Sequence, residues 1–193
     1  LQMIPITIYQ KQERSKAGYS LRTKKPSSIL LHSTNGKANT SFSVELNFLL
    51  TSEGAGADYL VGEGEIAQLL DSSKYYAWGA GDVNDQRFSN ENTINIEVHY
   101  SPLDTKPVSP AKLQNLYDLV TMLMQRYTIP LSSITMHRSV AVYPPDYKVV
   151  KLRGKLGRKI DPSFWKTDSQ FLAWKATLTQ LTEYVTLQEC FVY

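Results

Sequence analysis

The sequence predicts one α/β domain in which helices pack on a central mixed β-sheet. Two kinds of segment alternate along the 193 residues. Short apolar runs rich in β-branched residues are typical of strands, and longer segments with apolar residues three or four positions apart are typical of helices. Helices interspersed with strands indicate an α/β arrangement, and a chain of this length can bury a sizeable core.

Six short segments have the composition of β-strands. In chain order they are Met3–Tyr9, Ser27–Ser33, Asp58–Val61, Ile66–Leu70, Thr93–Val98 and Ile134–Met136. The third and fourth flank Gly62–Gly64, whose two glycines favour a hairpin turn. Apart from the first strand, the N-terminal residues up to 26 are polar and mixed, and we expect them to form a loop.

Three segments have the periodicity of helices: 41–51, 109–127 and 165–181. The second is the clearest, because Ser109 can cap its first turn and Pro110 suits the first helical position. In the first, most apolar residues fall on one face, but Val44 and Phe48 lie off it. We expect all three to bury their apolar faces against the sheet.

The composition excludes several classes of protein. Hydrophobic residues make up 42% and charged residues 20%, which is ordinary for a globular domain. No apolar run approaches the roughly 20 residues of a membrane-spanning helix. The single cysteine, Cys190, excludes an internal disulfide and any zinc site built on several thiolates.

The net charge of +3 has two interpretations. The basic residues, densest at Lys24–Lys25 and over 148–159, either form an ordinary solvated surface or attract an anionic polymer. No nucleic-acid-binding motif accompanies them, so we do not expect a nucleic-acid partner. The chain begins at Leu1 without a signal-peptide pattern, and we expect a processed chain or a domain cut from a longer protein. The sequence leaves localisation and oligomeric state open.

The chain has only three histidines, and each of them follows or ends a predicted strand. A single histidine in such a place is more often structural than functional. His32 and His137 combined with Asp161, however, would give two imidazoles and one carboxylate, a set suited to Zn²⁺ with a fourth position open for water. His99 ends the strand that contains Glu97, and the two side chains share one face if that strand is regular.

Six segments in a fixed order resemble those of one enzyme family. They are Leu30–Thr34, Ala57–Ile66, Ala77–Gly81, Ile94–Glu97, Met136–Arg138 and Arg158–Pro162. Over roughly residues 29–165 the chain resembles the zinc-dependent N-acetylmuramoyl-L-alanine amidases, whose fold is shared with peptidoglycan recognition proteins. The resemblance implies a single domain over 1–193, with an N-terminal extension (1–26), a family core (27–166) and a C-terminal helix and tail (167–193).

The resemblance also implies an activity and the residues that perform it. The activity is hydrolysis of the amide bond between N-acetylmuramic acid and L-alanine in peptidoglycan. His32, His137 and Asp161 would bind Zn²⁺, which polarises the scissile carbonyl and activates a water molecule. Glu97 would act as general base, because Ala57 occupies the place where one branch of the family has a catalytic tyrosine. Lys159 would stabilise the oxyanion.

Two further residues are candidates for binding the substrate. Asn35 closely follows the first zinc ligand, and Trp78 lies in the segment where the family often has Trp-His-Ala-Gly. This chain has Gly79 in place of that histidine, which puts substrate contacts in doubt rather than metal binding. Trp78 is equally compatible with a place in the core. The long interval between His137 and Asp161 is either a loop that borders the groove or a neutral insertion.

Two other functions remain open at this point. The same fold can bind peptidoglycan without cleaving it, and it can form a structural component of a virion or a larger lysin. The complete set of ligands, together with Glu97 and Lys159, favours catalysis. Among catalytic functions, the basic charge balance favours a phage or bacterial wall-lytic enzyme over a cytosolic recycling enzyme.

Overall fold

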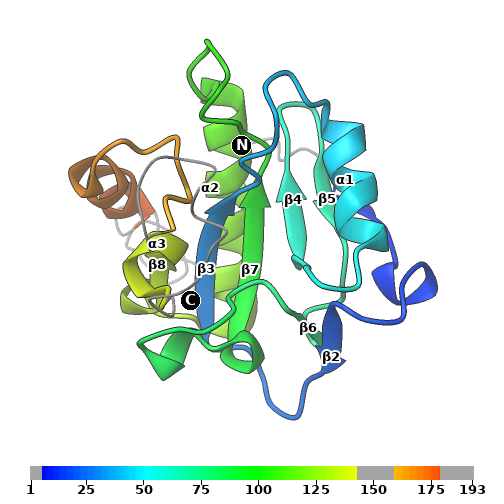
Figure 1. The fold of residues 1–193 in the computed structure, drawn as a ribbon. Helices are drawn as coiled ribbons and strands as arrows, with labels where there is room; N and C mark the ends of the chain where they lie inside the picture. The colour runs from blue at the N-terminus through cyan, green and yellow to red at the C-terminus, as the bar shows by residue number, and fades with distance from the viewer. Residues whose placement is uncertain (1–5, 143–158, 179–193) are drawn as a thin grey trace, which may run out of the picture.

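A computed structural model describes residues 6–142 and 159–178 of the chain. The central sheet has six strands in the order β1-β5-β4-β7-β3-β8 (Figure 1). Their bounds are Ile6–Ile8 (β1), Ser28–Ser33 (β3), Tyr59–Val61 (β4), Ile66–Gln68 (β5), Thr93–Val98 (β7) and Ile134–Met136 (β8). Only β4 and β5 pair antiparallel, as the predicted hairpin, and the other neighbours in this sheet pair parallel. The predicted mixed sheet is therefore confirmed.

The two faces of the central strands carry different chemistry. In the register of β3 and β7, Leu30 lies beside Asn95 and His32 beside Glu97. Because successive side chains of a strand alternate between faces, these four side chains share one face of the sheet. The opposite face carries apolar residues of the same strands: Ile29, Leu31, Ile94, Ile96 and Val98. One face is thus core, and the other is available for a polar site.

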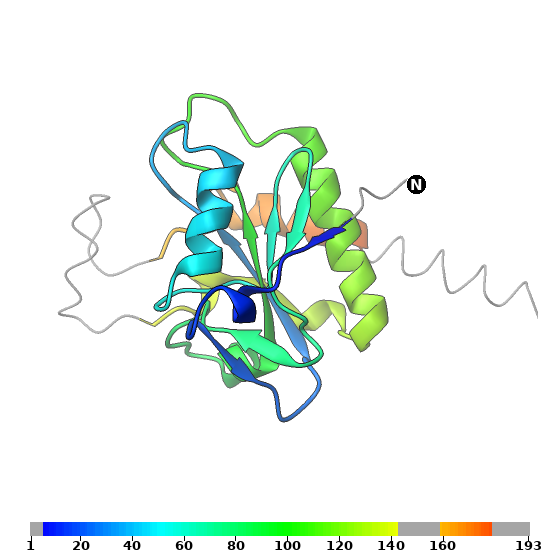
Figure 2. The same ribbon diagram turned by 90° about the vertical axis from the view of Figure 1, so that its right-hand side faces the viewer.

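The two long helices cover opposite faces of the sheet (Figure 2). Helix α2, Pro110–Tyr127, packs Leu116, Leu119, Val120 and Leu123 into the main core cluster. Helix α1, Phe42–Thr51, packs Leu46, Leu49 and Leu50 with residues of β4 and β5 in a second cluster. The Oγ atoms of Ser41 and Ser109 accept hydrogen bonds from Val44 N and Lys112 N. Both predicted helices and the Ser109 cap are confirmed, and Val44 and Phe48 are exposed.

The third predicted helix begins later than expected. Residues 168–178 are helical, and the predicted end at 181 lies outside the described residues. The Oγ1 of Thr167 accepts a hydrogen bond from Gln170 N, which is the geometry of an N-cap. Trp165 precedes the helix and is buried. Its ring centroid lies 4.6 Å from that of Phe164 and 5.2 Å from that of Phe171. Its apolar character reflects an aromatic cluster rather than the first turn of a helix.

Several short elements were not predicted. Strands β2, Tyr19–Leu21, and β6, Tyr75–Ala77, pair antiparallel in a small second sheet, so the expectation of a loop up to residue 26 was wrong there. Helix α3, His137–Val140, directly follows β8. The described residues also form 3₁₀ turns at Lys11–Glu13, Gln86–Phe88, Asn90–Asn92 and Leu131–Ser133. Three-residue strands depend on their partners, which local sequence does not show.

Some of the predicted features lie outside the described part of the chain. Cys190 and most of the interval between His137 and Asp161 lie outside the described residues. The division into extension, family core and C-terminal tail stays a prediction. Within the described part of the chain, no helix is long and apolar enough to span a membrane.

Asn115 of α2 joins this helix to the β4–β5 turn. Its buried Nδ2 donates to Gly62 O at 2.9 Å and to Glu63 O at 3.0 Å. We expect Asn115→Ala to lower the free energy of unfolding by about 1–3 kcal/mol, because two carbonyls lose their donor. Urea denaturation measures the change. Gln114→Ala on the exposed side of α2 should stay within about 0.5 kcal/mol, and equal losses in both variants would contradict this role.

Candidate metal centre

The three predicted metal ligands meet at one place in the structure. His32 Nδ1 lies 3.0 Å and His137 Nδ1 2.9 Å from the same atom, Asp161 Oδ2. All three side chains are buried, and their potential ligand atoms lie within 4.8 Å of one another. Residues 129 positions apart in the sequence thus form one compact group.

The sheet topology brings the two histidines together. Strands β3 and β8 are parallel neighbours, with Leu31 beside Met136 in their register. His32 and His137 each follow one of these paired residues, at the ends of the strands. The two rings lie 4.4 Å apart between centroids. Asp161 approaches from the C-terminal segment, where its carbonyl accepts a hydrogen bond from Arg138 N at 2.9 Å.

The outer nitrogen of each histidine faces a hydrogen-bond acceptor. His137 Nε2 lies 2.8 Å from the backbone oxygen of Ala80, and His32 Nε2 lies 2.8 Å from Asn95 Oδ1. A carbonyl oxygen only accepts, so these contacts require a proton on both Nε2 atoms. In a neutral imidazole the lone pair then resides on Nδ1, the atom that faces Asp161.

The resulting arrangement fits a bound cation. Burial, followed by the charge of His137, lowers the pKa of His32, which favours its neutral form. Burial raises the pKa of Asp161, but His137 and His32, which donate to its carboxylate whenever their Nδ1 atoms carry protons, outweigh this and bring it below the usual carboxyl range. A cation in the same place would stabilise the carboxylate in their stead. Two imidazole lone pairs and a carboxylate therefore converge on one point, and acceptors in that arrangement repel one another unless a cation lies between them. The nitrogen and oxygen donors are those of catalytic zinc sites.

Glu97 lies next to this group on the same face of the sheet. Its Oε2 atom is buried and has no hydrogen-bond partner within the described residues. Burial raises the pKa of Glu97 to about 8; the charge of Asp161 adds to the effect, and Lys159 opposes it. A carboxyl with such a pKa can accept and release a proton near neutral pH. Lys159 is exposed, and its charge is close enough to Glu97 to lower the pKa of that carboxyl. The catalytic roles of both residues stay predictions.

Asn35 connects the end of β3 to the segment after Asp161. Its Oδ1 accepts hydrogen bonds from Ser33 Oγ at 2.7 Å and from Ser163 Oγ at 2.5 Å. Its φ of 52° is in the left-handed region, which asparagine tolerates better than most residues. These contacts place Asn35 at the edge of the metal group, and its substrate-binding role stays a prediction.

Trp78 and His99 lie outside the metal group. Trp78 is 41% exposed, and its Nε1 donates to Ser20 Oγ at 2.9 Å, so the interpretation as a core residue was wrong. Its role in a substrate groove stays a prediction. His99 shares the α1 side of the sheet, where its Nε2 lies 2.7 Å from Thr40 O and its ring meets Phe42 edge-on.

The sequence did not single out Asn95, which contacts the first histidine. One signal was present, because Asn95 precedes Glu97 by two positions in a strand, and side chains two apart share a face. The carbonyl of Ala80 carries no such signal, since any residue supplies one. Both contacts come from segments far from the histidines in the chain.

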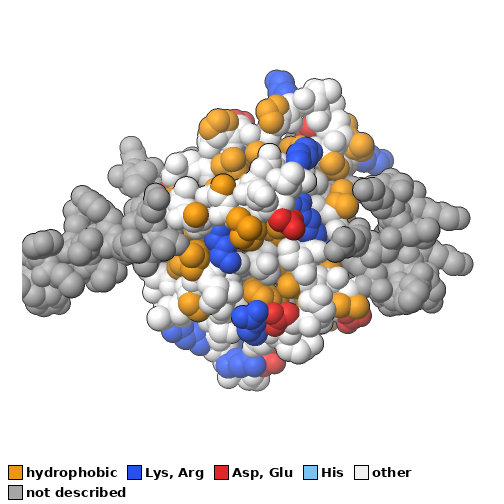
Figure 3. All heavy atoms as spheres, turned by 90° about the vertical axis from the view of Figure 1, so that its left-hand side faces the viewer, with side chains coloured by type: hydrophobic (Ala, Val, Ile, Leu, Met, Phe, Trp, Pro, Cys, Tyr) orange, Lys and Arg blue, Asp and Glu red, His pale blue; other side chains and the backbone are white. Residues whose placement is uncertain are grey.

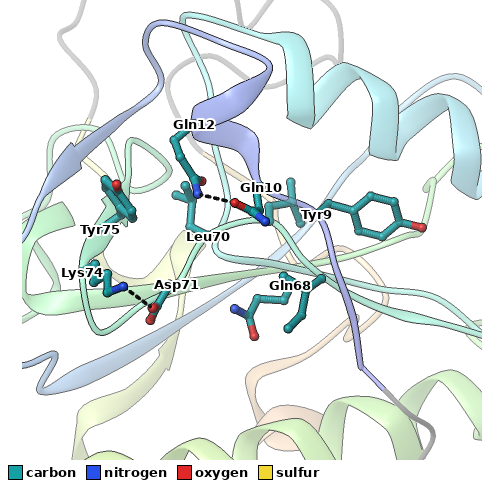
Figure 4. A pocket seen from close by; sticks show the side chains of 10 residues that line it. Tyr9, Gln10, Gln12, Gln68, Leu70, Asp71, Lys74 and Tyr75 are labelled. Atoms are coloured by element: carbon teal, nitrogen blue, oxygen red, sulfur yellow. Dashed lines mark hydrogen bonds and ion pairs between the residues drawn. The ribbon is translucent and has the colours of Figure 1, made fainter.

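The surface supplies two further observations. On the face drawn in Figure 3, Lys and Arg side chains are interspersed with acidic and hydrophobic ones. Most of the basic stretch over 148–159 lies outside the described residues, so both interpretations of the net charge stay predictions. Figure 4 shows a cavity of about 250 Å³ beside β1 and β5, with Tyr9, Gln68, Asp71 and Tyr75 among its lining. None of the three predicted ligands lines it. The metal group and this cavity are therefore separate features.

Comparison with known proteins identifies the family. The family model of the N-acetylmuramoyl-L-alanine amidases matches residues 22–164. The chain belongs to the N-acetylmuramoyl-L-alanine amidase family. It is therefore a hydrolase, an amidase whose family acts on peptidoglycan. No curated protein sequence gives a significant match.

Solved structures of the same fold support the architecture. PlyL is 20% identical, with a TM-score of 0.62 over 92% of this chain and 97% of that one. A mutant endolysin from Bacillus subtilis is 20% identical, with a TM-score of 0.60 over 90% and 99% of the two chains. AmiD from E. coli, an amidase, is 24% identical, with a TM-score of 0.50 over 61% and 50%. At these identities the likeness establishes the fold, which is the predicted peptidoglycan recognition protein-like one.

Asp161 is the charged member of the metal group. We expect Asp161→Asn to weaken binding of a divalent cation by about two orders of magnitude or more. The substitution keeps the size of the side chain but removes the negative charge of the carboxylate that faces both histidines. Isothermal titration and elemental analysis measure affinity and stoichiometry. Asp118→Asn on α2 is the matched control and should bind like the unmodified chain. Unchanged binding by Asp161→Asn would show that the cation does not occupy this group.

Proposed function

We propose that this amidase requires Zn²⁺ and hydrolyses the bond between N-acetylmuramic acid and L-alanine, and that it lyses bacterial cell walls. The observation that carries the proposal is the convergence of His32 Nδ1, His137 Nδ1 and Asp161 Oδ2, with both outer nitrogens already hydrogen-bonded. Two histidines and one carboxylate are a ligand set of catalytic zinc hydrolases, in which the fourth position stays open.

The comparisons support a muropeptide as substrate. The AmiD structure is a complex with anhydro-N-acetylmuramic acid bonded to L-Ala-D-γ-Glu-L-Lys. The similarity to PlyL and to the Bacillus subtilis endolysin extends over nearly the whole of those chains. These likenesses favour a wall-lytic enzyme over one that recycles small muropeptides.

The residues around the metal group have distinct roles in this proposal. When bound, Zn²⁺ polarises the scissile carbonyl and lowers the pKa of a water molecule toward about 7. Glu97 takes the proton of the attacking water and then delivers it to the leaving amine. Lys159 donates a hydrogen bond to the oxygen that becomes negative in the tetrahedral intermediate. His32 and His137 keep their Nδ1 lone pairs toward the metal through the contacts of their Nε2 atoms.

Glu97 is the residue whose loss separates catalysis from metal binding. We expect Glu97→Gln to slow cleavage of purified peptidoglycan by about 10²-fold or more while zinc stays bound, because glutamine keeps the shape but cannot accept the proton. Release of N-acetylmuramic acid from L-alanine, followed by mass spectrometry, measures the rate. Glu91→Gln is the control and should cleave at the unmodified rate.

The same assay distinguishes the alternative functions. A chain that binds one zinc but leaves peptidoglycan intact would be a binding module or a structural component of a virion or lysin. Full activity of Glu97→Gln would show that another group acts as the base.

Glu45 of α1 should make a small contribution to the pH dependence. It is buried, and its charge adds to the rise in the pKa of Glu97. Removing this like charge makes ionised Glu97 less costly, so its pKa falls and the base stays deprotonated at lower pH. We expect Glu45→Gln to move the acidic limb of the kcat/KM profile to lower pH, by on the order of a few tenths of a unit. Exposed Glu53→Gln should not move it, and an upward shift in Glu45→Gln would contradict the assignment.

A further inference from the structure

Asn95 contacts the metal group through His32, and hydrogen bonds hold both its backbone N–H and its backbone carbonyl. Its side chain is fully buried in β7. Its N–H donates to Asp58 Oδ2 at 2.8 Å, and its carbonyl accepts from Asp58 N at 2.8 Å. Asp58 is itself buried and held by Ser72 Oγ at 2.8 Å and by Arg22 at 3.8 Å. The carboxamide of Asn95 is therefore presented to His32 from a rigid support.

The carboxamide of Asn95 occupies space that is available because Gly79 has no side chain. A Cβ atom on Gly79 would lie 2.8 Å from Asn95 Cγ and 2.7 Å from the backbone oxygen of Gly56. Both distances are too short for a carbon atom, so a side chain at position 79 would displace the carboxamide or the backbone. The next residue, Ala80, supplies the oxygen that faces His137 Nε2. Gly79 thus makes room for the contact of Asn95 with His32, and Ala80 contacts His137 directly.

We propose that Asn95 is a positioning residue that selects the metal-binding tautomer of His32, and that Gly79 makes room for it. This inference rests on the proposed zinc site. A neutral imidazole carries its proton on either nitrogen. With the proton on Nδ1, His32 would donate to Asp161 Oδ2, which lies 3.0 Å away, and would have no lone pair there for a metal. An oxygen at Nε2 favours the other tautomer.

The two histidines differ in how this selection is achieved. His137 faces a backbone carbonyl, which is an acceptor whatever the sequence. His32 faces a carboxamide, whose oxygen and nitrogen favour opposite tautomers. The Nδ2 atom of Asn95 has no hydrogen-bond partner among the described residues, so hydrogen bonding at that atom does not stabilise the orientation of the amide. The amide of Asn95 and the imidazole of His32 therefore orient together, with the backbone of Asn95 held by Asp58 and its Oδ1 facing His32 Nε2. A substitution at position 95 can change this arrangement.

The experiment compares zinc affinity and folding in variants of the whole chain. Asn95→Leu keeps the number and branching of the heavy atoms and removes both polar atoms. Its methyl groups are larger than the carboxamide, so we expect a moderate loss of Tm in the zinc-free protein, which the control below takes into account. We expect its zinc Kd to rise about 10- to 100-fold. Asn95→Asp keeps an acceptor at Nε2 and should bind zinc within about threefold of the unmodified chain, since a carboxylate also orients metal-binding histidines. Asn95→Ala replaces the leucine variant if that variant does not fold.

Two controls separate positioning from general destabilisation. Asn115→Ala removes a buried asparagine on the other face of the sheet and should lower the Tm without changing the zinc Kd. Two-bond ¹H–¹⁵N spectra of the zinc-free protein report the tautomer directly: we expect protonated Nε2 in His32 of the unmodified chain and a mixture in Asn95→Leu.

Each outcome decides a different proposal. Unmodified affinity in Asn95→Leu, or equally weak binding in Asn95→Asp and Asn95→Leu, would overturn the positioning role. If the folded, unmodified chain binds no zinc, the proposed zinc dependence fails instead. Weak zinc binding by Asn115→Ala, in proportion to its lost stability, would show that affinity follows folding and not the contact with His32.

Discussion

Three buried acceptors that converge on one point are the constraint around which this molecule is organised. His32 Nδ1, His137 Nδ1 and Asp161 Oδ2 lie within 4.8 Å of one another. Such a group is costly in a protein interior unless a cation shares its charge. The outer nitrogens already face acceptors, so neither histidine can turn its lone pair away without losing a hydrogen bond. The geometry is therefore one that only a metal or a proton completes, and burial of His32 disfavours the proton.

The sheet supplies this geometry through the pairing of β3 with β7 and β8. All three strands are parallel, so their ends lie at one edge, where polar residues can gather without interrupting the ladder. Alternation along β7 places Ile94 and Ile96 in the core beneath α2 and turns Asn95 and Glu97 toward the metal group. A shift of one residue in this register would exchange the two sets, so apolar packing on one face also fixes the site on the other.

The parts of the structure that local sequence determines were predictable, and the parts that depend on distant contacts were not. Ser109 and Pro110 mark the start of α2, and β-branched residues mark β7, because these signals act within a few residues. His32, His137 and Asp161 were predicted from strand ends and from the family resemblance, and the structure brings them together. Strands β2 and β6 were missed, as was the later start of the last helix, where Trp165 joins an aromatic cluster. Asn95 was missed because its contact with His32 requires the space beside Gly79, which only the folded chain reveals.

Asp161 links the metal group to Glu97, the proposed base. Its negative charge raises the pKa of Glu97, after the larger effect of burial, to about 8. A bound cation would offset part of the negative charge of Asp161, so Asp161 would raise the pKa of Glu97 less. The ionisation of Glu97 would therefore respond to metal binding. Lys159 acts in the same direction as the cation, since its charge lowers the pKa of Glu97. Positive charge beside Glu97 therefore lowers its pKa and increases the fraction that is ionised at neutral pH. In the proposed mechanism, this couples proton transfer to assembly of the complete site.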